Sequence, residues 1–164
     1  MKSLLVVLLC AVSAPCFGAI EWRPVDPAEL AQKGPKIDPG ADAEVLLWDV
    51  RVEDRNDGGS ISQKLTNYLR IKIFTDHGKE DQATVEIPRY GKRSINNVAA
   101  RTIKANGSIV ELKRDQIFDR ELVKNKDQKV RGKTFVLPNV EPFDIIEYQY
   151  EEVRDVEVAQ YMLL

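Results

Sequence analysis

Hydrophobic and polar residues alternate with a period of two from Ala43 onward, and this pattern predicts β-strands. The first run, residues 43–53, places four hydrophobic side chains on one face: Leu46, Trp48, Val50 and Val52. The second run, residues 68–74, directs Leu69, Ile71 and Ile73 inward. Because this period is typical of a strand with one buried face, we expect two half-buried strands. Asn and Gly in residues 56–59 favour a turn between them.

Six further segments carry strand patterns separated by turn residues. They cover residues 83–87, 95–104, 108–112, 115–122, 133–137 and 145–153. We expect Pro88 to stop the first, and Asn106-Gly107 to join the second and third in a tight hairpin. Residues 76–79 (Asp-His-Gly-Lys) predict another turn, and the charged tract 123–132 predicts a loop. The fold class is therefore mainly β, an antiparallel β-sandwich or open barrel of about eight strands.

The residues before this alternation predict a short helix and a leader. Asp26 is placed as a helix N-cap, Pro27 occupies the first turn and Gly34 ends the helix. Residues 1–18 combine a basic start, a short apolar run and small residues, which together are typical of a signal peptide. The apolar run is shorter than the roughly 20 residues that a membrane span needs, although an uncleaved anchor is the alternative. We expect an exported protein, periplasmic or extracellular, with no stable span after cleavage.

These boundaries divide the chain into three parts. Residues 1–18 form the signal peptide, residues 19–42 an extension with the short helix, and residues 43–164 the β-domain. The sequence ends in the apolar run Tyr161-Met162-Leu163-Leu164, which is typical of a strand cut partway. We therefore expect the β-domain to be incomplete at its C-terminus and to leave a sheet edge unpaired.

Charge and cysteine content argue against several classes of function. Both cysteines, Cys10 and Cys16, lie in the leader, so the mature chain has no thiol for a disulfide or a Cys nucleophile. Leader removal takes one of 24 basic residues and none of the 26 acidic ones, which leaves a net charge of −3. This balance argues against binding to nucleic acid or to anionic lipid.

Candidate catalytic residues are few. His77 is the only histidine, so no pair of histidines can hold zinc, and its position favours a turn. A Ser-His-Asp triad would need His77 with one of four serines, none in a Gly-x-Ser-x-Gly motif: Ser60, Ser62, Ser94 and Ser108. Glu151 and Glu152 point to opposite faces of a strand and cannot act together on one bond. The sequence therefore predicts no catalytic residue.

Candidate binding motifs are equally weak. The run 54–58 resembles a calcium loop, but Gly58 stands fifth where the sixth position needs glycine, and Leu65 stands twelfth where glutamate is needed. Gly91-Lys92-Arg93-Ser94 lacks the glycine-rich loop of a phosphate site. Five aromatic residues at strand spacing are expected in the core, with a sugar-stacking platform as the alternative: Trp48, Phe74, Phe118, Tyr148 and Tyr150. We predict no cofactor and no metal site.

Three runs in order, residues 69–79, 98–108 and 134–150, resemble a known family. It is the domain of unknown function found before transglutaminase-like domains in exported bacterial proteins. The resemblance implies a β-rich accessory domain with no catalytic residues, next to a papain-like domain that carries a Cys-His-Asp triad. We therefore expect a non-enzymatic domain that serves a downstream transglutaminase-like domain or binds a partner protein or peptide by strand addition. The alternative is an exported hydrolase or carbohydrate-binding module.

Overall fold

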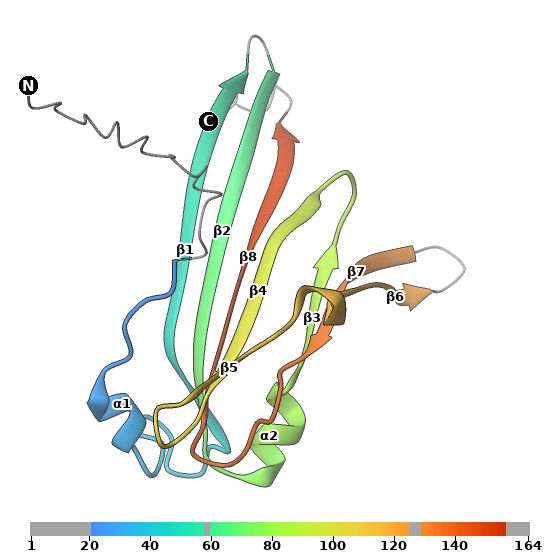
Figure 1. The fold of residues 1–164 in the computed structure, drawn as a ribbon. Coiled ribbons are helices and arrows are strands. Elements are labelled where there is room, and N and C mark those ends of the chain that lie inside the picture. The colour runs from blue at the N-terminus through green and yellow to red at the C-terminus, as the bar shows by residue number, and fades with distance from the viewer. Residues whose placement is uncertain (1–20, 58–59, 125–128, 157–164) are drawn as a thin grey trace, which may run out of the picture.

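The computed structural model describes residues 21–57, 60–124 and 129–156. Over these residues the chain forms eight strands, two short α-helices and a 3-10 helix (Figure 1). The helices are α1 (Pro27–Ala31), α2 (Asp76–Gln82) and the 3-10 helix η1 (Arg114–Gln116). The strands are β1 (Ala43–Asp57), β2 (Ser60–Ile73), β3 (Thr84–Arg89), β4 (Ser94–Ile103), β5 (Ile109–Glu111), β6 (Phe118–Lys124), β7 (Lys129–Val136) and β8 (Ile145–Val156).

The strands form two antiparallel sheets that stay open. The larger sheet has the order β1-β2-β8-β4-β5 and the smaller one β3-β7-β6. The predicted β-sandwich is thus confirmed, and the open barrel is not formed. The final described strand, β8, pairs with β2 on one side and β4 on the other, so it lies inside the sheet. The edges of the larger sheet are instead β1 and β5.

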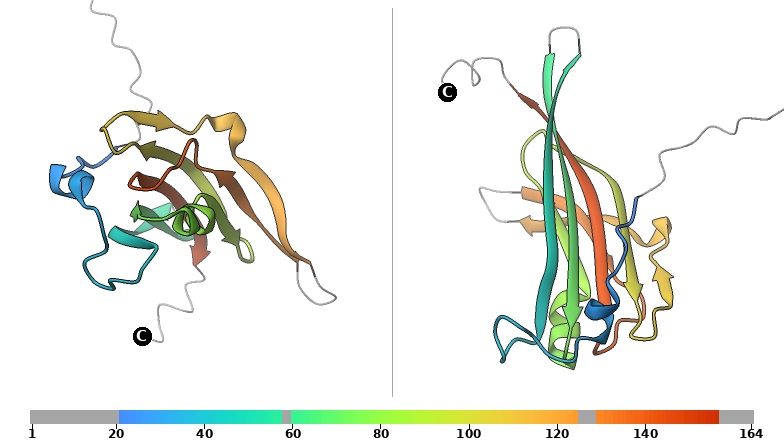
Figure 2. Two further views of the ribbon diagram at one scale, coloured as in Figure 1. Left: turned by 90° about the horizontal axis from the view of Figure 1, so that it is seen from below. Right: turned by 90° about the vertical axis from the view of Figure 1, so that its left-hand side faces the viewer.

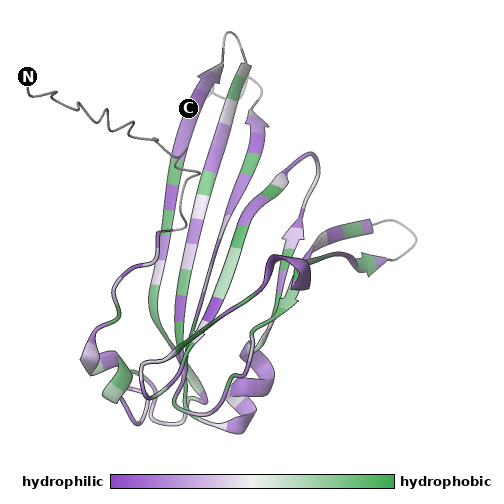
Figure 3. Ribbon diagram, viewed as in Figure 1, coloured by the Kyte–Doolittle hydropathy of each residue, from purple (hydrophilic) through white to green (hydrophobic). Residues whose placement is uncertain are grey.

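The core lies between the two sheets, which Figure 2 shows from two directions. Ile71, Ile73 and Ile146 of the larger sheet pack with Ile87 and Phe135 of the smaller one. The rings of Phe135 and Tyr148 meet edge to face across the interface, with centroids 6.1 Å apart. Full burial of each such side chain contributes roughly 1.5–3 kcal/mol to the free energy of folding. The alternation seen in the sequence is visible along the strands in Figure 3.

The larger sheet is longer than the sheet that covers it. β1 and β2 span 15 and 14 residues, whereas β3 and β7 span 6 and 8. The far ends of β1 and β2 therefore extend beyond the smaller sheet (Figure 1). Trp48, Val50 and Val52 are 67%, 45% and 53% exposed, because β1 is an edge strand that the three-stranded sheet does not cover from the side. The prediction that this face of β1 is buried is wrong, because burial depends on a second sheet that does not reach it.

Several other predictions need correction. Residues 76–79 begin helix α2 rather than a hairpin turn, because the Thr75 side chain caps it by accepting from the Gly78 N–H at 3.1 Å. Pro88 lies within β3, where an edge strand tolerates a missing N–H. All described residues of the tract 123–132 belong to β6 and β7, not to a loop. Phe118 is exposed rather than in the core.

Other predicted elements are confirmed. α1 begins with the Asp26 cap and Pro27 and ends at Ala31, before the expected Gly34. β4 and β5 form the expected hairpin, in which Gly107 has a φ of 85°. The signal peptide and the apolar run 161–164 lie outside the described residues, so those predictions stay predictions.

Candidate functional site

The most concentrated polar chemistry of the described residues lies on the outer face of the larger sheet, opposite the core. Alternation along β2 turns Tyr68, Arg70 and Lys72 away from Leu69 and Ile71. The sheet register then places Arg70 opposite Glu147 of β8, and Glu147 opposite Arg101 of β4. Three strands far apart in sequence therefore bring one carboxylate between two guanidinium groups.

Glu147 is the centre of this arrangement, which we call the Glu147 cluster (Tyr68, Arg70, Arg101 and Glu147). Its side chain is 0% exposed. The carboxylate oxygen Oε1 accepts from the Tyr68 hydroxyl at 2.7 Å and from Arg70 Nε at 2.5 Å. The other oxygen, Oε2, accepts from Arg101 Nε at 2.6 Å. Such charge-assisted bonds are the strong class of protein hydrogen bonds, and they leave Glu147 fully engaged.

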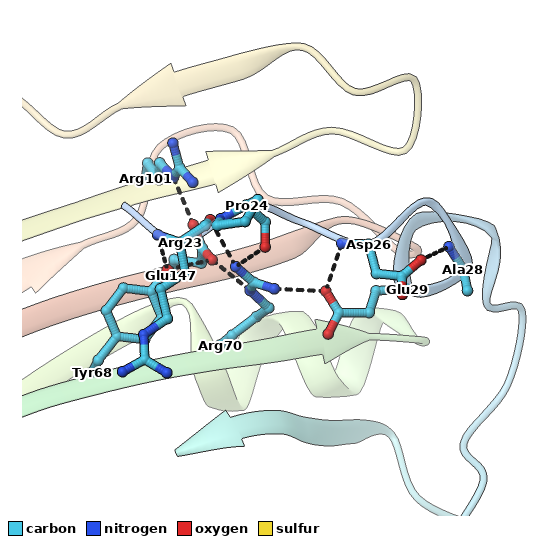
Figure 4. Close-up of polar contacts among 9 residues, drawn as sticks. All are labelled: Arg23, Pro24, Asp26, Ala28, Glu29, Tyr68, Arg70, Arg101 and Glu147. Carbon is cyan, nitrogen blue, oxygen red and sulfur yellow. Dashed lines mark hydrogen bonds and ion pairs between the residues drawn. The ribbon is translucent and has the colours of Figure 1, made fainter. Parts of the chain in front are cut away.

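The N-terminal segment, residues 21–29, covers the Glu147 cluster (Figure 4). Arg70 donates to the backbone oxygens of Arg23 and Pro24 and forms an ion pair with Glu29 at 2.7 Å. The Arg101 guanidinium stacks on the Trp22 ring, with its Cζ atom 4.4 Å from the ring centroid. The cluster therefore fastens the start of the described chain to the sheet while the tryptophan keeps water away from the charges.

The surroundings of Glu147 shift the ionisation of its neighbours. Burial raises the pKa of the Tyr68 phenol, and its hydrogen bond to Glu147 raises it further. For Arg70, burial opposes the charged form, but the hydrogen bond and charge of Glu147 outweigh it, so the pKa is raised. Both groups therefore stay protonated at neutral pH and act as donors to Glu147.

Two more buried charges, on Lys72 and Asp144, lie near the same end of the sheet. Lys72, also 0% exposed, donates to the backbone oxygens of Leu30 and Phe143 at 3.0 and 2.7 Å. Burial lowers its pKa, and the charge of Lys33 lowers it further. Asp144 accepts from Lys104 Nζ at 2.5 Å. These contacts hold α1 and the loop before β8 in place, so their role is structural.

A cleft of about 650 Å³ opens at the bulge of β4, and we call it the β4 cleft. The register between β4 and β8 shifts between Asn96 and Ala99, and Asn97 takes a φ of 50°. Its side chain donates to Glu151 at 2.6 Å. The remaining lining is mostly polar and includes Thr66, Arg114, Lys133, Gln149 and Tyr150. Burial raises the pKa of the Tyr150 phenol. A polar ligand could be held there by hydrogen bonds.

The other candidates from the sequence do not meet in one place. His77 is exposed at the start of α2, with Nδ1 3.0 Å from an Asp42 oxygen. Glu151 bonds Asn97 and Lys64, whereas Glu152 bonds Arg93, as expected for opposite faces. Within residues 21–57, 60–124 and 129–156, no group of three or more His, Cys, Asp or Glu side chains could hold a metal ion.

Sequence analysis missed the Glu147 cluster. The signal was present in Arg70 and Lys72, which stand between aliphatic residues in a strand. Alternation alone does not show whether a second layer covers the polar side of a strand, so their pattern does not distinguish a buried charge from a solvated one. Trp22, a large hydrophobic residue in a segment rich in proline and charge, was the remaining clue.

Comparison with known proteins now adds to this geometry. Residues 60–161 match the family described as "Domain of Unknown Function with solved-structure structure (DUF3857)". This chain belongs to the DUF3857 family. No curated protein matches the sequence. None of the described helices is long and apolar enough to cross a membrane.

A solved structure has the same fold. It is the crystal structure of a putative protease from Parabacteroides distasonis ATCC 8503 at 2.00 Å resolution. The two structures superpose with a TM-score of 0.59 at 15% sequence identity. The match covers 68% of this chain but 23% of the Parabacteroides distasonis chain. At this identity the likeness concerns the fold, and this DUF3857 fold makes up a minor part of that larger protein.

Proposed function

We propose that this DUF3857 protein is a non-catalytic, exported β-domain that supports a transglutaminase-like catalytic domain or binds a partner protein. The observation that carries the proposal is the enclosure of Glu147. A general acid or base must lie within hydrogen-bond reach of its substrate. Glu147 is 0% exposed, and its oxygens are taken by Tyr68, Arg70 and Arg101. The strongest charge cluster therefore holds the chain together instead of facing a ligand.

Two further facts support an accessory role. The fold corresponds to 23% of the Parabacteroides distasonis chain, so it is compatible with a domain that works beside others. The two cysteines of this chain lie in the predicted leader, so an exported form would carry no thiol nucleophile of its own. A catalytic cysteine would then have to come from another domain or protein.

The experiment compares the chain alone with the chain plus a catalytic partner. The candidate partners are any transglutaminase-like proteins encoded in the same reading frame or beside it. Transamidation and amide hydrolysis are measured with and without this chain. We expect no turnover by the chain alone and a faster or more stable partner when both are present.

Matched variants separate this outcome from a hidden activity. Glu147→Gln removes the buried carboxylate, and Glu111→Gln removes an exposed carboxylate on β5. Turnover by the chain alone that disappears in Glu147→Gln but not in Glu111→Gln would contradict the proposal. Circular dichroism of both variants shows whether lost activity merely reflects unfolding.

A second candidate, carbohydrate binding, is favoured by the β4 cleft. Its size falls within the range of small-ligand sites, and Tyr150 among amide and carboxylate side chains suits a hydroxyl-rich ligand. Calorimetric titration with a panel of oligosaccharides tests it. Gln149 lines the cleft and Gln116 lies outside it. Binding heat that disappears in Gln149→Ala but remains in Gln116→Ala would favour this candidate over the accessory role.

A further inference from the structure

β1 is a long edge strand with an uncovered hydrophobic face. Among the described residues, β1 pairs with β2 alone. Trp48, Val50 and Val52 form a row on its inner face and are each close to half exposed or more. An uncovered edge that also presents an apolar row is a template for another strand.

The hydrogen-bonding groups on the open side of β1 can be assigned from its register with β2. Asp57 lies opposite Ser60, with two residues between them in the sequence, and such a hairpin closes on a hydrogen-bonded pair. Hydrogen-bonded pairs then recur at every second residue, which include Asp49 and Arg51. The residues between them, Trp48, Val50 and Val52, therefore direct their N–H and C=O groups outward.

The outer face of β1 limits what can pair there. Its charges alternate in sign along the strand in the order Asp49, Arg51, Glu53 and Arg55. An antiparallel copy of the same strand centred on Arg51 would place arginine against arginine and Asp49 against Glu53, which is unfavourable. A copy centred on Val50 places Asp49 against Arg51 twice. That register also places Trp48 against Val52 twice, on the inner face. A copy centred on Val52 matches opposite charges too, but it sets the hydrophobic Trp48 and Val50 against the polar Asn56 and Asp54.

We propose that a second copy of this chain pairs with β1 in antiparallel orientation about a two-fold axis at Val50. This register joins the outward main-chain groups of both strands, two Asp49–Arg51 contacts on the outer face and two Trp48–Val52 contacts on the inner face. The two five-stranded sheets become one continuous sheet. This isologous contact uses the same patch on both chains, as closed dimers do. It goes beyond the accessory role and does not depend on it.

Neighbouring contacts leave this register available. Arg23 of the N-terminal segment forms an ion pair with Asp49 from the outer face, and Lys64 pairs with Glu53 at 2.9 Å. Both cations lie within the same chain and do not occupy the edge. Arg51 is exposed and lies two residues from Asp49 on the same strand. A partner's Asp49 therefore adds to the charge balance.

The test begins with the oligomeric state of the purified chain over the micromolar range, by sedimentation and by light scattering. A reversible monomer–dimer equilibrium is expected, with a blue shift of tryptophan emission as Trp48 becomes covered. Arg51→Glu replaces two opposite-charge contacts by two like-charge contacts and should raise the dissociation constant about tenfold or more. Arg131→Glu makes the same charge change on an exposed residue of β7 and should have no effect.

Two further measurements fix the register. Arg51→Glu mixed with Asp49→Lys should form heterodimers, because the altered charges are complementary only between the two variants. Val50→Cys should form an intermolecular disulfide, because facing Cα atoms in a hydrogen-bonded pair are about 5.5 Å apart. The control variant Ile109→Cys on β5 should form no such disulfide. A chain that stays monomeric throughout overturns the proposal, even if it binds an extended peptide, as does a dimer indifferent to the Arg51 and Asp49 variants.

Discussion

Replacement of Glu147 by glutamine is expected to be among the most damaging single changes in this fold. The substitution keeps the shape but removes the charge between Arg70 and Arg101. Its amide also presents a donor where one guanidinium N–H now donates. In the variant, Arg70 keeps its ion pair with Glu29 at 2.7 Å, whereas Arg101 keeps only its contact with the Trp22 ring.

The size of the loss follows from burial. Removing one partner from a buried ion pair costs about 3–5 kcal/mol, because the remaining charge stays desolvated. For a domain of this size that corresponds to a fall in Tm of about 10 °C. Glu121→Gln is the matched control, since Glu121 pairs with Lys129 at 2.6 Å on the surface. An exposed pair of this kind contributes less than about 1 kcal/mol.

Urea unfolding followed by circular dichroism measures both variants. The double variant Glu147→Gln with Arg101→Met should lose less stability than the sum of the single changes, because it removes the stranded guanidinium as well. A loss below about 1 kcal/mol for Glu147→Gln, equal to that of Glu121→Gln, would refute the assignment of a buried, coupled cluster.

Three other predictions follow from single contacts. The pKa of His77 is raised by its hydrogen bond with Asp42, so NMR titration should place it above 6.5, and Asp42→Asn should return it toward that value. The associated stabilisation is fully present below the unfolded pKa and is lost as pH rises through the folded pKa. Gly132→Ala should destabilise the fold by about 1–3 kcal/mol in urea unfolding, because its Cβ would lie 2.3 Å from a backbone oxygen of β3. Asp26→Ala should cost about 1 kcal/mol in the same assay by removing the α1 cap, unlike Asp26→Asn.

Local chemistry was enough to predict much of this fold. The Asn106-Gly107 pair, the Asp26 cap and the inward Leu69, Ile71 and Ile73 each depend on residues close in sequence. The strand pattern likewise determined the sandwich class. These features are readable because a turn, a cap or a period of two is set by the dihedral preferences of a few neighbouring residues.

Contacts distant in sequence could not be predicted in this way. Trp48 fits a buried strand face by its pattern, but the smaller sheet does not reach it. Arg70 fits a solvated face, but a segment 46 or 47 residues earlier in the chain covers it. The place of β1 at the sheet edge decides the first and the path of the N-terminal segment decides the second, and alternation contains no information about either. The helix at Asp76 differs from the predicted turn because the Thr75 side chain caps it, and turns and helix starts favour the same polar residues.

The fastening of the N-terminal segment by β8 has a consequence for how the chain acquires its structure. Gln149 of β8 donates to the backbone oxygen of Glu21 across 128 residues of sequence, and Glu147 holds Arg101 against the Trp22 ring. The N-terminal segment, residues 21–29, therefore lacks part of its docking surface until β8 has emerged. Contacts between residues so far apart in sequence slow folding, because the chain loses the entropy of loop closure before the contacts stabilise it. Complete docking of residues 21–29 should be a late kinetic event, and a chain halted before Ile145 would leave Arg70 without Glu147.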